Sequence, residues 1–429
     1  MGSNPKHFEI IGYPLKFSIP PALRNRRYLY LWLGLLVSIA GSQMQIAAIF
    51  WHIRILTGNP QPLALGGIGL ARILPVIVFS FIGGPVADTL NRRGILFVTQ
   101  TAMALGALVL AILTFTGKIT IGYIYLLTAF QATAVAFDGP ARQAMIPNIV
   151  SAEDLPSAFS MSSIASNAGS IIGPALSGIV IVALGQGYTY FFNAISFLAV
   201  IIALVMIGPV MQDSKKSGIH LSAAMDGIRF ILGKPIILST MLMDFVATFF
   251  ASANTMMPIV AKDILKVGEI GYGWLSSAQA IGSVIAGLVI SQVKKLPKQG
   301  LTFLIAVVIF GTATVLFGGT TVFTIAMVAL ILMGAADAVS TIIRNTIRQL
   351  NTPDHIRGRM TAVNQIFFQG GPQLGEVESG IVAALFGVPA AIISGGIGCI
   401  IGSALIVLKW PQLRTYNGDE HLQAKALID

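Results

Sequence analysis

The chain has 429 residues, of which 55% are hydrophobic and only 10% carry a charge. Soluble proteins of ordinary composition contain about 25% charged residues. The 27 basic and 17 acidic side chains could not cover the surface of the two or three water-soluble domains that this length would form. Composition therefore excludes a soluble enzyme and a nucleic-acid-binding protein, and it indicates that the chain folds within a lipid bilayer.

We expect twelve membrane-spanning helices, because twelve mostly apolar runs have the length that crosses a bilayer, about 20 residues. These runs cover residues 28–50, 63–86, 95–116, 120–141, 157–184, 189–209, 237–259, 272–292, 300–318, 322–344, 361–386 and 389–409. A transmembrane barrel would instead show alternating segments of about ten residues. Residues 1–27 are polar and basic and do not resemble a signal peptide. The predicted fold class is an all-α integral membrane protein of two six-helix bundles.

The distribution of positive charge predicts the orientation of the chain in the membrane. Of the 27 Lys and Arg residues, 22 fall on the side of the two termini, four fall on the other side, and Arg72 lies within a span. Because cytoplasmic loops carry the excess of Lys and Arg, we expect both termini in the cytoplasm of a bacterial inner membrane. The net charge of +10 is then a consequence of topology and does not indicate a nucleic-acid partner.

A long polar stretch at residues 211–236 divides the predicted spans six and six. The exits of the fourth and tenth spans are similar, with Arg142-Gln-Ala-Met in one and Arg344-Asn-Thr-Ile in the other. Such internal similarity is typical of a duplicated six-helix unit. The expected organisation is an arm at 1–27, a bundle at 28–210, a linker at 211–236, a second bundle at 237–410 and a tail at 411–429.

Polar side chains recur at helical spacing on the first, fourth, seventh and tenth spans, which predicts that these spans line an aqueous path. Hydrogen bonding between helices would explain the Ser and Thr residues equally well. It explains Asp244 and Asp337 less easily, because each carboxylate costs about 2.5–3.5 kcal/mol at the bilayer centre. The candidate substrate-cavity residues, with a stripe on the eleventh span, are Gln45, Gln131, Thr248, Phe249, Gln365, Gln369 and Gln373.

Arg72 lies about ten residues into the second span and needs a partner near the membrane midplane. The expected partner is a carboxylate on the eleventh span, either Glu376 or Glu378. These two acids point about 200° apart on a helix, so they cannot have the same role. The alternative is that Arg72 bonds only to carbonyl groups or water.

Cysteine and histidine give no indication of a metal or redox centre. The single Cys399 lies in the last span, and the five histidines are scattered without ligand spacing. We therefore expect no cofactor, no metal site and no enzymatic activity.

Three motifs resemble those of the major facilitator superfamily. The second loop reads Gly84-Pro-Val-Ala-Asp88-Thr-Leu-Asn-Arg92-Arg93-Gly94, which is similar to the loop signature Gly-x-Leu-Ala-Asp-Arg-x-Gly-Arg-Lys. The fifth span contains Gly169, Gly173, Pro174 and Gly178 in a pattern similar to the superfamily's antiporter motif, with Ser177 in place of one Gly. Segments around Asp138, Asp337 and Gln369 look like the branch of enterobactin exporters and macrolide-efflux proteins. The resemblance covers residues 25–410.

The resemblance implies transport by alternating access, in which two bundles rock about a midplane site. It assigns to the cytoplasmic gate the residues Asp88, Arg92, Arg93, Asp138, Arg142, Asp337 and Arg344. A carboxyl group screened from water can load and release a proton near neutral pH. The proton-coupling candidates are Asp244 first and Glu376 second, whereas Asp138 and Asp337 could couple protons or form gate pairs with their neighbouring arginines.

The resulting hypothesis is a monomeric exporter of an amphipathic small molecule, a siderophore or a drug, driven by the proton gradient. The same fold could serve a proton-coupled importer of a small solute, although the antiporter-like segment argues against it. A non-transporting membrane sensor is a third possibility. It would need larger soluble domains than the short loops of this chain supply.

Overall fold

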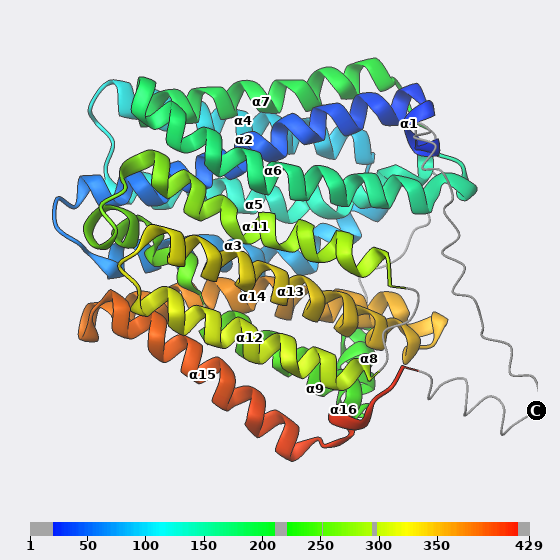
Figure 1. Ribbon diagram of the computed structural model, residues 1–429. Coiled ribbons are helices and arrows are strands. Elements are labelled where there is room, and N and C mark those ends of the chain that lie inside the picture. Colours follow the sequence, from blue (N-terminus) through cyan, green and yellow to red (C-terminus); the bar gives the residue numbers. More distant parts are fainter. Residues whose placement is uncertain (1–19, 211–220, 251, 294–297, 419–429) are drawn as a thin grey trace, which may run out of the picture.

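The computed structural model describes residues 20–210, 221–250, 252–293 and 298–418. In this part of the chain every regular element is a helix (Figure 1). The long helices of the first half are α2 (Arg26–Leu56), α3 (Pro62–Thr89), α4 (Arg92–Phe115), α5 (Ile121–Met145), α6 (Leu155–Leu184) and α7 (Gln186–Ile207). Those of the second half are α9 (Pro235–Phe250), α11 (Gly268–Ser291), α12 (Gln299–Gly319), α13 (Phe323–Leu350), α14 (Asp354–Phe386) and α15 (Val388–Lys409).

Within the described residues, 11 helical segments are long and apolar enough to cross a membrane. They correspond to eleven of the twelve predicted spans. The twelfth, α14, has 33 residues and is long enough to cross, but its glutamines and its two glutamates make it more polar than the others. The chain is therefore a multi-pass membrane protein with a twelve-helix fold, and its most polar helix lies inside the assembly.

The seventh span departs from the continuous helix that the sequence predicts over 237–259. The helix α9 ends at Phe250, and the chain continues through the short helices η3 (Ala253–Met256), α10 (Met257–Ile259) and the π-helix η4 (Val260–Ile264). Proline lacks the backbone N–H and its ring collides with the carbonyl four residues earlier, so Pro258 opposes a regular helix across Asn254. Interrupted helices are found where transporters bind their substrates.

The remaining short helices lie mainly at one end of the molecule. They are α1 (Pro21–Arg24), η1 (Ile146–Asn148), η2 (Ala152–Asp154), α8 (Leu221–Leu232) and α16 (Gln412–Thr415). Figure 1 places α1, α8 and α16 at the same end, which we call the linker end; the opposite end is called the far end. The helix α8 lies within the predicted linker 211–236.

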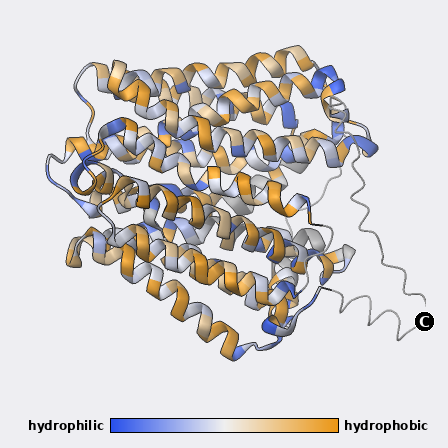
Figure 2. Ribbon diagram, viewed as in Figure 1, coloured by the Kyte–Doolittle hydropathy of each residue, from blue (hydrophilic) through white to orange (hydrophobic). Residues whose placement is uncertain are grey.

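The two halves lie side by side, with α3 packed on α14 and α6 packed on α11 across the boundary (Figure 1). Hydrophobic residues run along most of the length of the helices, and hydrophilic residues gather toward the two ends (Figure 2). Many large apolar side chains of the long helices are exposed on the outside of the molecule, for example Leu126, Leu288 and Leu408. This distribution is the one that a hydrocarbon surrounding stabilises.

Close packing of α11 on α13 depends on glycine. A Cβ atom added at Gly282 would overlap the carbonyl oxygen of Ile331, and one added at Gly334 would overlap that of Gln279. In contrast, a Cβ atom at Gly287, also in α11, would meet no atom within 4 Å. Small residues allow such close approach of helices in membranes.

We expect Gly282→Ala to lower the melting temperature of the purified protein in detergent by several degrees, because overpacking costs about 1–3 kcal/mol. The matched control Gly287→Ala adds the same methyl group to the same helix and should leave the melting temperature unchanged or raise it slightly. Equal melting curves for the two variants would contradict the packing role of Gly282.

Candidate transport pathway

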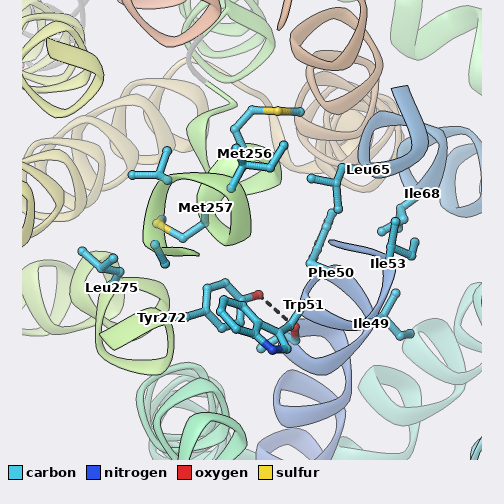
Figure 3. Close-up of a cluster of buried hydrophobic side chains, with 14 of the residues drawn as sticks. Ile49, Phe50, Trp51, Ile53, Leu65, Ile68, Met256, Met257, Tyr272 and Leu275 are labelled. Carbon is cyan, nitrogen blue, oxygen red and sulfur yellow. Dashed lines mark hydrogen bonds between the residues drawn. The ribbon is translucent and has the colours of Figure 1, made fainter. Parts of the chain in front are cut away.

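Aromatic and methionine side chains close the space between the two halves near the far end. Trp51 on α2 packs against Tyr272 on α11 with ring centroids 5.1 Å apart, and the Tyr272 hydroxyl donates a hydrogen bond of 2.8 Å to the carbonyl of Ala47 (Figure 3). Met256 and Met257, from the interrupted seventh span, complete this far-end cluster and are buried. The cluster therefore fills the space between α2, α11 and the seventh span with buried side chains.

An ion pair joins the halves at the same end. The guanidinium of Arg54, at the C-terminus of α2, donates to both carboxylate oxygens of Asp263 at 2.7 and 2.6 Å. Arg54 also donates to the carbonyl of Gly58 at 3.0 Å, and its side chain is only 4% exposed. Asp263 lies in the π-helix η4, a rare kind of helix that is frequent at functional sites. Sequence reasoning missed this pair, because residues at the ends of spans are expected to be solvated.

Two adjoining cavities of about 250 and 290 Å³ lie between the halves on the linker side of the far-end cluster. Both are lined by Ser170 of α6, Asn254 of η3, and Gln279 and Ala280 of α11. The side chains that line only one of them are Gln43, Ile46, Ala47, Phe50, Pro174, Tyr272 and Ser276 in the first, and Asn167, Thr248, Ser252, Ser283, Phe310, Met333, Gly334, Asp337 and Pro372 in the second. Hydroxyl and amide groups therefore dominate the polar part of the wall.

A cluster of charges lies beside the second cavity. The Arg344 Nη2 atom lies 2.9 Å from Asp244 Oδ1 and 3.5 Å from Asp337 Oδ1. Arg344 also donates to the hydroxyls of Ser340 at 2.9 Å and Thr341 at 2.7 Å. Asp244 and Arg344 are buried, whereas the Asp337 side chain is 46% exposed. The sequence predicts Asp244 as an isolated acid; the fold instead places it against Arg344 from another helix.

A second arginine, Arg348, lies one turn further along α13 and is also buried. It donates to Asn364 of α14, to Asn345 at 2.6 Å and to the carbonyl of Arg344 at 3.2 Å. These contacts connect α13 with α14 through amide groups.

The expected partner of Arg72 is found on α14. Arg72 Nη1 donates to Glu376 Oε1 at 3.0 Å, and this contact joins the two halves. Glu376 is buried, and its other oxygen has no hydrogen-bond partner among the residues that the structure describes. Of the two carboxylates that the sequence leaves open, the geometry selects Glu376, since no ion pair of Glu378 occurs among the described residues. Both Arg72 and Glu376 lie outside the cavity wall.

The described contacts of the gate residues Asp138, Arg142, Arg92 and Arg93 lie within the first half. Asp138 accepts hydrogen bonds from Thr99 at 3.1 Å and Gln100 at 2.8 Å, and Arg142 lies 3.9 Å from it. Arg92 donates to the carbonyl of Ala144 at 2.9 Å, and Arg93 donates to that of Leu204 at 2.9 Å. The side chain of Asp88 lies outside the described residues.

Among the predicted cavity residues, the structure places only Thr248 in the wall of the described cavities. Gln45 and Gln131 instead bond to each other at 2.5 Å, and Asn193 donates to Gln45 at 2.7 Å. Neither glutamine lines the described cavities, because buried amides satisfy one another inside the first bundle, between α2, α5 and α7.

Phe249 and Gln373 also lie outside the cavity wall. The Phe249 ring stacks on Phe245 with centroids 5.7 Å apart. Gln373 is buried, and its backbone carbonyl oxygen lies close to Gly69 of α3. The side chains of Gln365 and Gln369 are outside the described residues.

The antiporter-like motif in α6 faces two neighbours. A Cβ atom at Gly169 would lie 3.1 Å from the backbone nitrogen of Ala40 in α2, and one at Gly178 would lie 2.5 Å from the carbonyl oxygen of Glu269. Gly173 also approaches α2, and Pro174 lines the first cavity. The motif therefore brings α6 against both halves at once.

Most of the polar wall residues on α6 and α11 are not among the residues that the sequence predicts for the cavity. They follow helical spacing in the sequence, with Asn167, Ser170 and Pro174 on one helix and Ser276, Gln279 and Ser283 on the other. This spacing is a signal that could have identified them, although it is weaker than the stripes on the fourth, seventh, tenth and eleventh spans, because it includes no charged residue.

Comparisons with known proteins agree with this architecture. Residues 18–426 match the sequence profile of a family described as transmembrane secretion effector. The enterobactin exporter EntS of Salmonella choleraesuis is 24% identical over 336 residues, which cover 78% of this chain and 81% of that protein. The multidrug efflux pump Tap of Mycolicibacterium fortuitum is 24% identical over 387 residues, covering 87% and 93%.

Solved structures show the same fold at low sequence identity. A bacterial homologue of the human lysosomal transporter Spinster, in an inward-facing and occupied conformation, superimposes with a TM-score of 0.72 at 13% identity, covering 92% of this chain and 99% of that one. A POT family transporter in complex with a thioalcohol-conjugated peptide gives a TM-score of 0.72 at 11% identity, covering 90% and 96%.

Proposed function

The chain belongs to the transmembrane secretion effector family of the major facilitator superfamily, and from this membership we propose that it is a proton-driven exporter of an amphipathic small molecule. The observation that supports this proposal most directly is the polar cavity between the halves, which has Asp337 in its wall and the Asp244–Arg344 pair beside that residue. The names of the relatives, an enterobactin exporter and a multidrug pump, support export of a siderophore or a drug.

The proposed orientation places the linker end in the cytoplasm of a bacterial inner membrane. The excess of Lys and Arg on the side of the termini supports it. The far-end cluster and the Arg54–Asp263 pair then close the pathway toward the outer side. Export requires these contacts to break while contacts toward the linker end form, so that the cavity opens outward.

Proton coupling in this proposal uses buried carboxylates that are paired with arginine across helices. Asp244 is the first candidate, because its proton would neutralise the partner of Arg344 next to the cavity. Glu376 is the second candidate, because its proton would weaken the Arg72 contact between the halves. Each protonation changes the balance between two conformations that differ in their ion pairs.

Flux in proteoliposomes tests the proposal. With an imposed pH gradient, we expect ethidium, rhodamine 6G or a catechol siderophore to move against the direction of proton flow several times faster than in protein-free liposomes. Collapsing the gradient with nigericin should remove the difference.

Movement of solute in the same direction as protons would indicate an importer. The proton-antiport proposal would be wrong if an imposed gradient left the flux of every compound unchanged.

A further inference from the structure

We propose that the cavity between the halves binds a solute with a cationic group and several hydrogen-bonding groups, and that Asp337 is the counter-ion of that cation. This inference rests on the proposed transport function and specifies its substrate class. It differs from the sequence-based hypothesis, in which Asp337 couples protons or forms a gate pair with its neighbouring arginine and does not bind the substrate.

The charge of the cavity wall favours a cationic solute. Asp337 is the one charged side chain among the described residues that line the two cavities, and it is 46% exposed. The two arginines nearest to it are buried and engaged: Arg344 lies against Asp244, and Arg348 lies among amides. The charged group that a solute meets in the described wall is therefore the Asp337 carboxylate, which favours a cationic group over an anionic one.

The contacts of the Asp337 carboxylate leave it available to a cation. Its carboxylate lies 3.5 Å from both Arg344 Nη2 and the Thr341 hydroxyl, which are the outer limits of hydrogen bonding. Arg344 has a shorter contact with Asp244, at 2.9 Å. An incoming ammonium or other cation can therefore bind Asp337 without leaving the arginine unpaired.

The neutral part of the wall offers hydrogen-bonding groups and apolar surface. Asn254 donates to Gln279 at 3.0 Å and Gln43 donates to Ser170 at 2.9 Å, so the amides are held in place and still have free donors and acceptors. Phe310 and Met333 line the same cavity as Asp337 and supply apolar contact. The combination fits an amphipathic cation with hydroxyl, amide or ether groups.

Competition at Asp337 would couple such a solute to protons. A proton and a cationic group cannot occupy the same carboxylate, so the binding of one releases the other. The groups that face Asp337 are Arg344 on its own helix and, through that arginine, Asp244 of α9; Arg348 lies one turn beyond. The number of positive charges in the cavity then stays constant when a monovalent solute exchanges for one proton.

Two dyes with the same xanthene ring system and opposite charge test the proposal on the purified full-length protein. Fluorescence polarisation should show that cationic rhodamine 6G binds and that anionic fluorescein binds at least tenfold more weakly. Asp337→Asn should weaken rhodamine 6G binding by about tenfold, which corresponds to about 1.4 kcal/mol, and Asp337→Glu should restore most of it. The control Glu153→Gln removes an exposed acid at η2 and should leave both affinities unchanged.

The proposal is overturned if fluorescein binds as tightly as rhodamine 6G, if neither dye binds, or if Asp337→Asn leaves the rhodamine affinity unchanged. Dye binding needs no gradient, so its failure is separable from failure of the transport proposal. Gradient-driven flux of a neutral or anionic compound without rhodamine binding would reject the cationic substrate and leave export intact.

Discussion

Replacing Asp244 by Asn should destabilise the folded protein by about 3–5 kcal/mol, because the substitution leaves the Arg344 guanidinium buried beside a neutral group. Arg344 is 2% exposed, and its other carboxylate contact, Asp337, lies at 3.5 Å with nearly half of its surface in solvent. The surrounding hydroxyls of Ser340 and Thr341 accept hydrogen bonds but carry no charge. Thermal unfolding of the purified protein in detergent measures the effect as a large drop in melting temperature.

The double variant Asp244→Asn/Arg344→Gln should be more stable than Asp244→Asn alone, because it removes both buried charges together. A matched single control is Asp138→Asn, which also changes a buried acid of the inner helices. Its close partners, Thr99 and Gln100, are neutral donors, so a smaller loss of about 1–3 kcal/mol is expected. Additive losses in the double variant would show that Asp244 and Arg344 are not energetically coupled.

The same substitution addresses proton coupling. If Asp244 carries the proton, Asp244→Asn should abolish flux driven by a pH gradient and retain exchange of solute at equal pH on both sides. If the flux of Asp244→Asn depends on the gradient as the unmodified protein does, Asp244 is not the proton carrier. Asp337 and Glu376 are then the remaining candidates.

The sequence predicts most of the helices because each span is an independent hydrophobic segment whose length is set by the bilayer. It fails at the seventh span, where the effect of Pro258 depends on neighbours that satisfy the freed backbone groups. The short helix η3, which follows α9 in this span, lies against the two cavities, and its residue Asn254 lines both of them. Sequence reasoning therefore locates the span and misses the feature within it that matters for function.

One ion pair can be predicted from the sequence, and another cannot. Arg72 with Glu376 is predictable, because a lone arginine near the midplane must find one of very few carboxylates. In contrast, Arg344 has the acid Asp337 two turns away on its own helix. The local spacing therefore suggests an Arg344–Asp337 pair first. The shorter contact is with Asp244, 100 positions away in the sequence, and only the packing of α13 against α9 brings it there.

Polar stripes indicate that a helix face needs partners, but they do not say whether those partners are side chains or water. Gln45 and Gln131 lie on stripes that predict a cavity, yet each bonds to a neighbouring amide inside the first bundle. Ser170 and Gln279 carry similar chemistry on α6 and α11, where the two halves leave space between them. The distinction comes from the shape of the assembled halves and has no counterpart in the local sequence.

Removing the Arg54–Asp263 pair should make the cavity more accessible from the far end. The pair is bidentate and joins the halves, and Arg54 is 4% exposed while Asp263 is 30% exposed, so its loss should cost the closed state about 1–2 kcal/mol. A shift of 1.4 kcal/mol changes the open population about tenfold. We therefore expect Arg54→Gln to raise the rate at which a membrane-impermeant maleimide, added from the far side, labels a cysteine placed at Ser276 in the cavity wall.

The chain is suited to this measurement, because its single cysteine, Cys399, is buried and can be replaced by Ala to give a silent background. Asp263→Asn should raise labelling to the same extent as Arg54→Gln, and combining the two should add little, since either change removes the same contact. Lys262→Gln alters a neighbouring exposed charge of the π-helix and should leave the rate unchanged. If Arg54→Gln and Lys262→Gln label at the same rate, the far-end pair does not hold the halves together, and closure there depends on the packing of Trp51 against Tyr272 and of the two methionines.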